Sequence, residues 1–157
     1  MRNIYYEKTK IGYITIVENN GKITNVYFGK KDDLKDVKVK ETDTLRKAFL
    51  ELNEYLDGKR ATFDLELDLS NQGTEFMRDV WNRLKEIPYG KTKSYGEIAK
   101  EVNRPKAYRA VGMSNNKNPI PIFIPCHRVI GSNNKLVGYG GGIDIKEFLL
   151  KLEKENK

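Results

Sequence analysis

The character of this sequence changes near residue 72, and that change constrains the fold more than any other feature. Residues 1–72 hold 13 Lys and Arg against 13 Asp and Glu, whereas residues 73–157 hold 16 against 9, so the second part accounts for the whole net charge of +7. Strand-like patterns dominate the first part, and helical periodicity dominates the second. A chain of 157 residues suits one domain or two small ones. We therefore predict an N-terminal domain over 1–72 and a C-terminal domain over 73–157.

The first part opens with segments that favour strands, because they are rich in β-branched and aromatic residues. An Asn-Asn-Gly turn signal at 19–21 separates two of them and predicts a hairpin. The Lys- and Asp-rich run over 30–41 is predicted to be a loop. The expected strands cover residues 4–6, 11–17 and 23–28.

A helix and one more strand complete the first part. Thr42 or Asp43 can cap a helix with apolar side chains at i, i+4, i+7 and i+11, and Gly58 ends it. Residues 63–69 alternate strictly between apolar and acidic side chains, which predicts a half-buried strand. Three acids on one face could serve as metal ligands, but no His or fourth acid accompanies them, so a solvated outer face is favoured. The apolar helix positions are Leu45, Phe49, Leu52 and Leu56.

The second part contains helices separated by strong breakers. Thr74 can cap a helix that Pro-Tyr-Gly at 88–90 stops, and Ser94 with Glu97 has the spacing of a capping box for the next helix. After a break at 103–105, a further helix begins near Lys106. Two short helices around a tight break outline a helix-turn-helix. A last amphipathic helix starts at Asp144 and runs through Ile145, Phe148, Leu149 and Leu152.

The helix over 107–115 consists mainly of small residues around one long cation, Arg109. Such a helix can approach another surface closely, but tight packing on a neighbouring helix explains the pattern equally well. Residues 102–143 contain six Lys and Arg and no acidic residue. This favours a polyanionic partner, most often nucleic acid, with a solvated basic face as the plain alternative.

The segment over 118–130 holds the only cysteine and the only histidine of the chain. Three prolines within seven residues stiffen it, and the apolar residues between them are expected to be buried. Positive charge on His127 and Arg128 would favour a nucleophilic thiolate at Cys126, whereas an inert buried cysteine is the alternative. In an extended backbone the side chains of Cys126 and His127 diverge, so a water would have to bridge them.

Composition excludes several classes of protein. One Cys cannot form an internal disulfide, and one Cys with one His cannot close a zinc site, so no metal is expected. The mean hydropathy is −0.67, no apolar run approaches the roughly 20 residues that cross a bilayer, and the N-terminus lacks the apolar region of a secretory signal. The glycine-rich run at 138–142 lacks the Lys-Ser/Thr of a phosphate-binding loop. We expect a cytoplasmic monomer with no membrane contact.

Ile-Pro-Cys-His-Arg-Val, preceded by Asn-Pro-Ile-Pro and followed by Gly-Tyr-Gly-Gly-Gly, resembles the signature of the O6-alkylguanine-DNA alkyltransferases, also called methylated-DNA–protein-cysteine methyltransferases. The resemblance extends with matching spacing from about Phe76 to Glu153. It implies an α/β (α+β) chain with a small N-terminal ribonuclease-H-like domain. A mostly helical, winged helix-turn-helix-like C-terminal domain would follow. The first part matches this family only in outline, and no functional residue is assigned to it.

The resemblance implies a single-turnover repair reaction on double-stranded DNA containing O6-alkylguanine, with O4-alkylthymine as a minor substrate. Cys126 would receive the methyl or larger alkyl group after the nucleotide is flipped out of the stack. Glu153 would orient His127, which would take the thiol proton through a water. Tyr95 would donate a proton to the leaving base and crowd the phosphate of the rotated nucleotide. No cofactor is implied.

The resemblance also implies a DNA interface and a substrate pocket. Arg109 would enter the base stack and fill the vacated space, and Asn118 would bridge the recognition helix and the active-site loop. A non-catalytic lesion-binding or winged-helix DNA-binding protein, with Cys126 serving only in packing, is the competing hypothesis. The remaining implied DNA contacts are Gly96, Arg104 and Ser132, and the pocket would also be lined by Val129, Tyr139 and Gly140.

Overall fold

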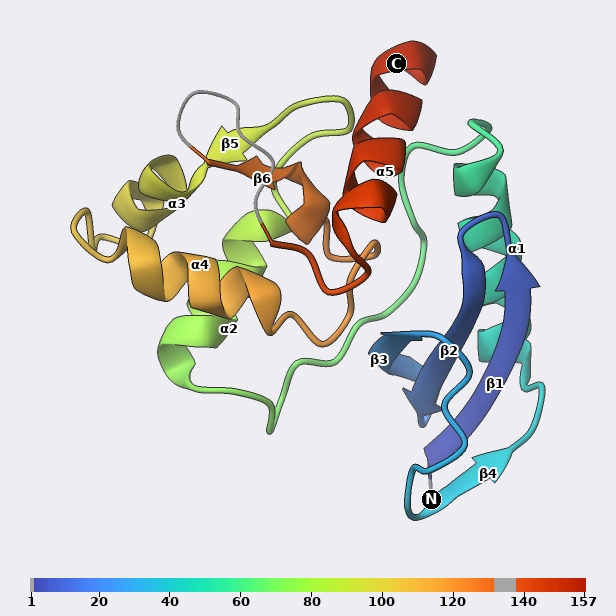
Figure 1. The fold of residues 1–157 in the computed structure, drawn as a ribbon. Coiled ribbons are helices and arrows are strands. Elements are labelled where there is room, and N and C mark those ends of the chain that lie inside the picture. The colour runs from blue at the N-terminus through green and yellow to red at the C-terminus, as the bar shows by residue number, and fades with distance from the viewer. Residues whose placement is uncertain (1, 132–137) are drawn as a thin grey trace. The chain divides into compact units, whose positions relative to one another are not determined.

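A computed structural model describes residues 2–131 and 138–157, and the chain divides into two compact units, Met1–Ser70 and Asn71–Lys157 (Figure 1). The first unit carries a sheet and one long helix, and the second is mostly helical. This mixed α/β architecture confirms the fold class predicted from the sequence.

The sheet of the first unit has the strand order β3-β2-β1-β4, with α1 packed against β1 and β2. The antiparallel neighbours β2 and β3 join through Asn20 and Gly21, whose φ angles are 53° and 82°. Asparagine and glycine tolerate these positive φ values, which is why the Asn-Asn-Gly signal specifies this hairpin. The elements are β1 (Arg2–Thr9), β2 (Gly12–Asn19), β3 (Lys22–Phe28), β4 (Val37–Val39) and α1 (Asp43–Leu56).

The predicted helix of the first unit is confirmed together with its cap. The Thr42 hydroxyl accepts a hydrogen bond of 3.2 Å from Leu45 N, which satisfies one of the free N–H groups of the first turn. The predicted apolar face of α1 is buried and supplies much of this unit's core, together with Ile14, Ile16 and Ile23 from the sheet.

The prediction of a loop over 30–41 is wrong in part. Val37–Val39 forms β4, which pairs in parallel with the edge of β1, and Lys40 N then donates to Ile4 O over 3.0 Å. A strand of three residues exists only because β1 offers an unpaired edge. The local sequence carries no information about that edge.

The predicted strand over 63–69 is also wrong. The segment pairs with the sheet only at Leu67, which forms an isolated bridge with Ile23. Its alternation is nevertheless visible in burial, since Asp64 and Glu66 are exposed while Phe63 and Leu65 are half-buried. The alternating pattern therefore predicted which side chains are more buried, but the segment forms one bridge with β3 and no ladder.

The second unit begins with helices whose predicted caps are present. The Thr74 hydroxyl accepts from Met77 N over 3.1 Å, and Ser94 and Glu97 form both bonds of a capping box. Helices α2, α3 and α4 pack on one another, and α5 packs against the 3₁₀ turn η1. The elements are α2 (Glu75–Leu84), β5 (Lys93–Ser94), α3 (Tyr95–Glu101), α4 (Tyr108–Asn116), η1 (Cys126–Arg128), β6 (Val129–Ile130) and α5 (Ile143–Asn156).

The core of the second unit is built around Trp81 of α2. Its Nε1 donates to Ser114 O of α4 over 2.7 Å, so the indole joins the two helices while it fills the space between them. Gly73, with φ 66°, lies directly against this ring, because a Cβ at this position would stand 2.6 Å from Trp81 Cη2. Within residues 2–131 and 138–157, no helix has the length and apolar character needed to cross a membrane.

One prediction for α5 is wrong. Phe148, expected on the apolar side, is 39 % exposed, whereas the Lys146 side chain is fully buried. The buried stripe runs through Lys146, Leu149 and Glu153 at i, i+3 and i+7, so two of its three members are ionisable. Tertiary contacts to charged and polar partners override the hydrophobic pattern here.

Candidate active site

Glu153 on α5 is the centre of a buried network of hydrogen bonds. Its carboxylate lies 2.6 Å from His127 Nε2 and accepts two bonds from Arg128, from Nε over 2.8 Å and from Nη2 over 3.0 Å. Gly90 N adds a fourth bond of 2.9 Å. Because Glu153, His127 and Arg128 are all buried, these contacts replace water as the partners of the carboxylate.

Arg128 was predicted only as a cation beside the cysteine, and its actual place is different. Its guanidinium binds Glu153 in a bidentate manner and donates through Nη1 to Ile87 O over 2.7 Å. A planar guanidinium is suited to such a fork, which fixes the carboxylate in orientation as well as in charge. Arg128 therefore holds the glutamate that faces His127.

Cys126 and His127 lie on η1, a 3₁₀ turn, and not on the extended backbone assumed from the sequence. The turn follows the proline-rich segment, in which residues 120–130 are all buried, as predicted. The side chain of His127 is directed to Glu153, so the histidine is held from the side of α5. Glu153 is thus the group that orients His127, a role that the adjacent Cys126 could not fill.

The thiol of Cys126 is protonated at rest. Burial raises its pKa to about 11, and this outweighs the opposing effects of a hydrogen bond from Asn118 and of the positive charge on Lys146. Positive charge does lower the pKa of this thiol, but the charge belongs to Lys146, and desolvation outweighs it. Burial likewise lowers the pKa of His127, against the effect of Glu153, so the imidazole is neutral and can accept a proton.

Two asparagines at the end of α4 and just beyond it hold the cysteine-bearing loop. Asn118 Nδ2 donates to Ile124 O over 2.9 Å, and its Oδ1 accepts from Ile120 N over 3.0 Å. Asn115 Nδ2 donates to the carbonyl of Cys126 itself over 3.3 Å. The link between α4 and the active-site loop that was expected of Asn118 is thus shared with Asn115, which the sequence did not single out.

Lys146 is a second residue that the sequence did not single out. Its Nζ donates to Val129 O over 2.7 Å, and its charge acts on Cys126. Burial lowers the pKa of Lys146, whereas a thiolate at Cys126 would raise it. The signal available in the sequence was its i, i+7 spacing from Glu153, although a lysine in an amphipathic helix is normally assigned to the solvent face.

Tyr95 is the first residue of α3, directly after its capping residue Ser94. Burial raises the pKa of its phenol, and the charge of a Cys126 thiolate raises it further, so the two side chains interact electrostatically. Its ring lies beside Gly112 of α4, where a Cβ would stand 3.9 Å from Tyr95 Cε1. The capping box and the close approach of α4 therefore position this tyrosine.

The other residues predicted to contact DNA lie on or near α3 and α4. Arg109 is exposed on α4, Arg104 is exposed in the turn before it, and Gly96 is half-buried on α3. Val129 is buried on β6, and Tyr139 and Gly140 precede α5, half-buried and exposed respectively. Ser132 lies outside the described residues.

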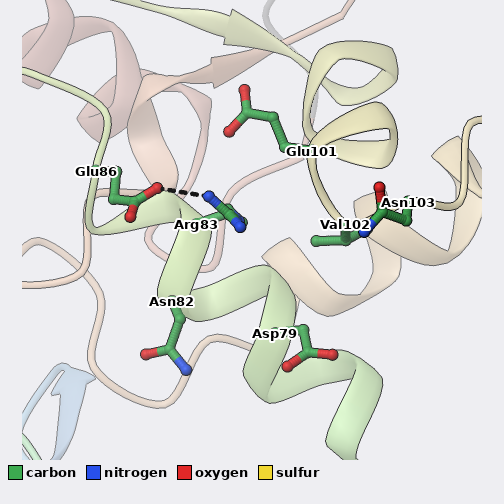
Figure 2. Close-up of a pocket in the computed structure, with 7 residues that line it drawn as sticks. All are labelled: Asp79, Asn82, Arg83, Glu86, Glu101, Val102 and Asn103. Atoms are coloured by element: carbon green, nitrogen blue, oxygen red, sulfur yellow. Dashed lines mark hydrogen bonds and ion pairs between the residues drawn. The ribbon is translucent and has the colours of Figure 1, made fainter.

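A polar hollow of about 360 Å³ is lined by residues of α2 and α3 and the segments that follow them, and Cys126 is not part of its lining (Figure 2). Its wall carries the carboxylates of Asp79, Glu86 and Glu101, and Arg83 is paired with Glu86 over 3.0 Å. Three carboxylates disfavour the binding of a polyanion, so this hollow is not the DNA-binding site expected from the sequence. In the described part of the chain, no three His, Cys, Asp or Glu side chains gather closely enough to hold a metal ion.

The site has the arrangement of a cysteine nucleophile. The thiol of Cys126 is buried beside a neutral histidine, and the carboxylate of Glu153 orients that histidine. The chain carries this site in the second of two domains. Two family profiles make the class specific. Residues 1–69 match the ribonuclease-like domain of 6-O-methylguanine DNA methyltransferase, and residues 75–155 match its DNA binding domain. This chain belongs to that family.

Individual relatives agree across nearly the whole chain. The methylated-DNA–protein-cysteine methyltransferase of Methanosarcina acetivorans is 50 % identical over 155 residues, which cover 96 % of this chain and 98 % of that protein. The constitutive enzyme of the same name from Bacillus subtilis is 44 % identical over 154 residues, covering 94 % and 92 %. The crystal structure of Mycobacterium tuberculosis OGT in complex with DNA superposes with a TM-score of 0.91 at 42 % identity, covering 98 % of this chain and 94 % of that one.

Proposed function

We propose that this protein repairs DNA by direct reversal of damage, as a methylated-DNA–protein-cysteine S-methyltransferase that acts once. It transfers a methyl or larger alkyl group from guanine O6, and to a lesser extent from thymine O4, to Cys126. The observation that carries the proposal is the 2.6 Å contact between His127 and Glu153 behind a buried cysteine. A cysteine that serves only in packing requires no such oriented base.

The thiol must lose its proton during the reaction, because its pKa is raised by burial. With Nε2 of His127 engaged by Glu153, the basic nitrogen of the neutral imidazole is Nδ1, which takes the thiol proton through a water. Glu153 then stabilises the imidazolium, and the bidentate Arg128 keeps the carboxylate in place. Asn118 and Lys146 stabilise the thiolate as it forms.

The transfer is an in-line displacement at the alkyl carbon. The bond from Cys126 Sγ to carbon forms while the bond from carbon to O6 breaks, and the electron pair of the broken bond stays with guanine. Tyr95 donates a proton to the leaving base, and its phenolate recovers a proton from the imidazolium through solvent. The products are a stable thioether and an unmodified guanine, so no cofactor is consumed and no step regenerates the thiol.

The alkyl carbon is inaccessible inside a duplex, so the nucleotide must first be flipped out. Arg109 enters the stack in its place, and Gly96, Arg104 and Ser132 contact the backbone, with a binding affinity that depends strongly on salt. Asn118, Val129, Tyr139 and Gly140 shape the pocket around the extruded base. The second domain performs binding and transfer, and the first has a structural role. A monomeric state and a cytoplasmic location stay predictions.

The decisive experiment is intact-mass analysis after incubation with a duplex that contains one O6-methylguanine. We expect a gain of one methyl group that peptide mapping places on Cys126. Binding of the duplex with unchanged mass would instead support the competing hypothesis of a lesion-binding protein. Cys126→Ala should bind the duplex and gain no mass, and methyl gain in that variant would refute the assignment of the nucleophile.

A further inference from the structure

Helix α4 carries two large side chains in a position that nothing in the reaction explains. Tyr108 is 51 % exposed and Met113 is 62 % exposed. Neither can be accommodated in the core, because the inward stripe of the helix is already formed by Val111, Ser114 and Asn115, all buried. Two large exposed side chains on one short helix suit an interaction surface.

Both side chains are close to Arg109. The ring centroid of Tyr108 lies 5.9 Å from the Arg109 guanidinium carbon, which is within the range of a cation–π contact. Met113 follows Arg109 by four residues, so the two share one face of α4 a single turn apart. The guanidinium of Arg109 therefore contacts the ring of Tyr108, and Met113 lies one turn further along the same face of α4.

The surroundings identify the partner. Four cations are exposed on α4 and the segments that flank it, and no acidic residue occurs between residues 102 and 143, so this part of the surface favours a polyanion over an acidic protein. The four are Arg104, Lys106, Arg109 and Lys117. Proteins that distort duplex DNA often insert apolar side chains, methionine among them, beside a basic one at a base step. A hydrophobic protein partner would not require the acid-free surroundings.

We infer that Tyr108 and Met113 contact the DNA duplex on either side of Arg109, where they pack against base edges and deoxyribose and hold the duplex open while the damaged nucleotide is flipped. This inference rests on the proposed function and adds two residues to its DNA interface. Tyr108 also keeps the guanidinium over its ring before DNA binds, so that Arg109 is positioned to enter the stack.

The test compares two substrates, an O6-methylguanine duplex and the free base O6-benzylguanine, which needs no flipping. Single-turnover transfer to Cys126 is measured for Met113→Ala and Tyr108→Ala, beside Met113→Leu and Tyr108→Phe, which keep the bulk and the ring. Leu50→Ala serves as the matched control, since Leu50 is 60 % exposed on α1 in the other unit.

We expect the two alanine variants to react about tenfold more slowly with the duplex and at the wild-type rate with the free base. The conservative variants and Leu50→Ala should match the wild type on both substrates. Unchanged duplex rates, or equal slowing on both substrates, would overturn the inference. A shift in sedimentation caused by the alanine variants would assign the surface to contact between copies of the chain and would also overturn it. Absence of transfer in the wild type would contradict the proposed function itself.

Discussion

Glu153 Oε2 lies 2.6 Å from His127 Nε2 at a point where neither side chain reaches solvent, and 26 residues of chain separate the two. Because Arg128 binds the same carboxylate, the histidine faces a fixed and charge-balanced partner. The orientation of His127 is therefore set by tertiary structure, which supports its proposed role as the base that acts on Cys126.

Glu153→Gln should impair both transfer and stability. The amide keeps the size of the side chain but leaves the buried guanidinium of Arg128 without its counter-charge, which should lower the free energy of unfolding by about 3 kcal/mol. Loss of the oriented base should slow transfer about 100-fold. Single-turnover kinetics and urea unfolding measure the two effects. Glu155→Gln is the matched control, because Glu155 is exposed on the same helix, and an equal loss in that variant would contradict the argument.

Lys146→Met should change the pH dependence of transfer. Removing the positive charge near Cys126 raises the thiol pKa further, so the rising limb of the rate profile should move to higher pH. A displacement of one pH unit corresponds to about a tenfold slower reaction at pH 7. Transfer from free O6-benzylguanine between pH 6 and 10 provides the profile. A purely structural role for Lys146 would lower the rate equally at every pH, and the exposed Lys151→Met should leave the profile unchanged.

Stability should fall at alkaline pH because of Cys126. Its folded pKa of about 11 lies above its ordinary value of 9.0, so the unfolded chain releases the proton first. The contribution is complete below pH 9 and is lost as the pH rises toward 11, for a total of about 3 kcal/mol. Urea unfolding at intervals from pH 7 to 10.5 should show this decline. About 2 kcal/mol of this loss falls within that pH range, so the decline should be smaller by about 2 kcal/mol in Cys126→Ser. Parallel curves for the two proteins would refute the raised pKa of Cys126.

The capping box of α3 should matter for activity as well as for folding. Ser94→Ala and Thr74→Ala each remove one cap and should each lower stability by about 1 kcal/mol. Only Ser94 precedes Tyr95, so only Ser94→Ala should slow transfer, and by several-fold, because it loosens the start of α3. Thermal unfolding and single-turnover kinetics separate the effects. Equal slowing in both variants would show that Tyr95 does not depend on its cap.

Local sequence was sufficient wherever a structure depends on neighbours in the chain. The Asn-Asn-Gly hairpin, the Thr42 and Thr74 caps and the Ser94–Glu97 box were all predictable, because a turn or a cap is satisfied within a few residues. Short pairings were not predictable, since β4 depends on a free edge of β1 and the bridge at Leu67 depends on Ile23.

The motif around Cys126 by itself determined the family, and the distribution of charge along the chain predicted a basic surface in its second part. Only the tertiary structure decided that η1 is a turn, that Arg128 and Lys146 are buried, and that Phe148 on α5 is not. The physical reason is desolvation. A charged side chain can leave water only where another element supplies its counter-charge or carbonyl, as Glu153 does for Arg128 and Val129 does for Lys146. Such partners lie far away in sequence, so their effect on Cys126 appears only when the chain is folded.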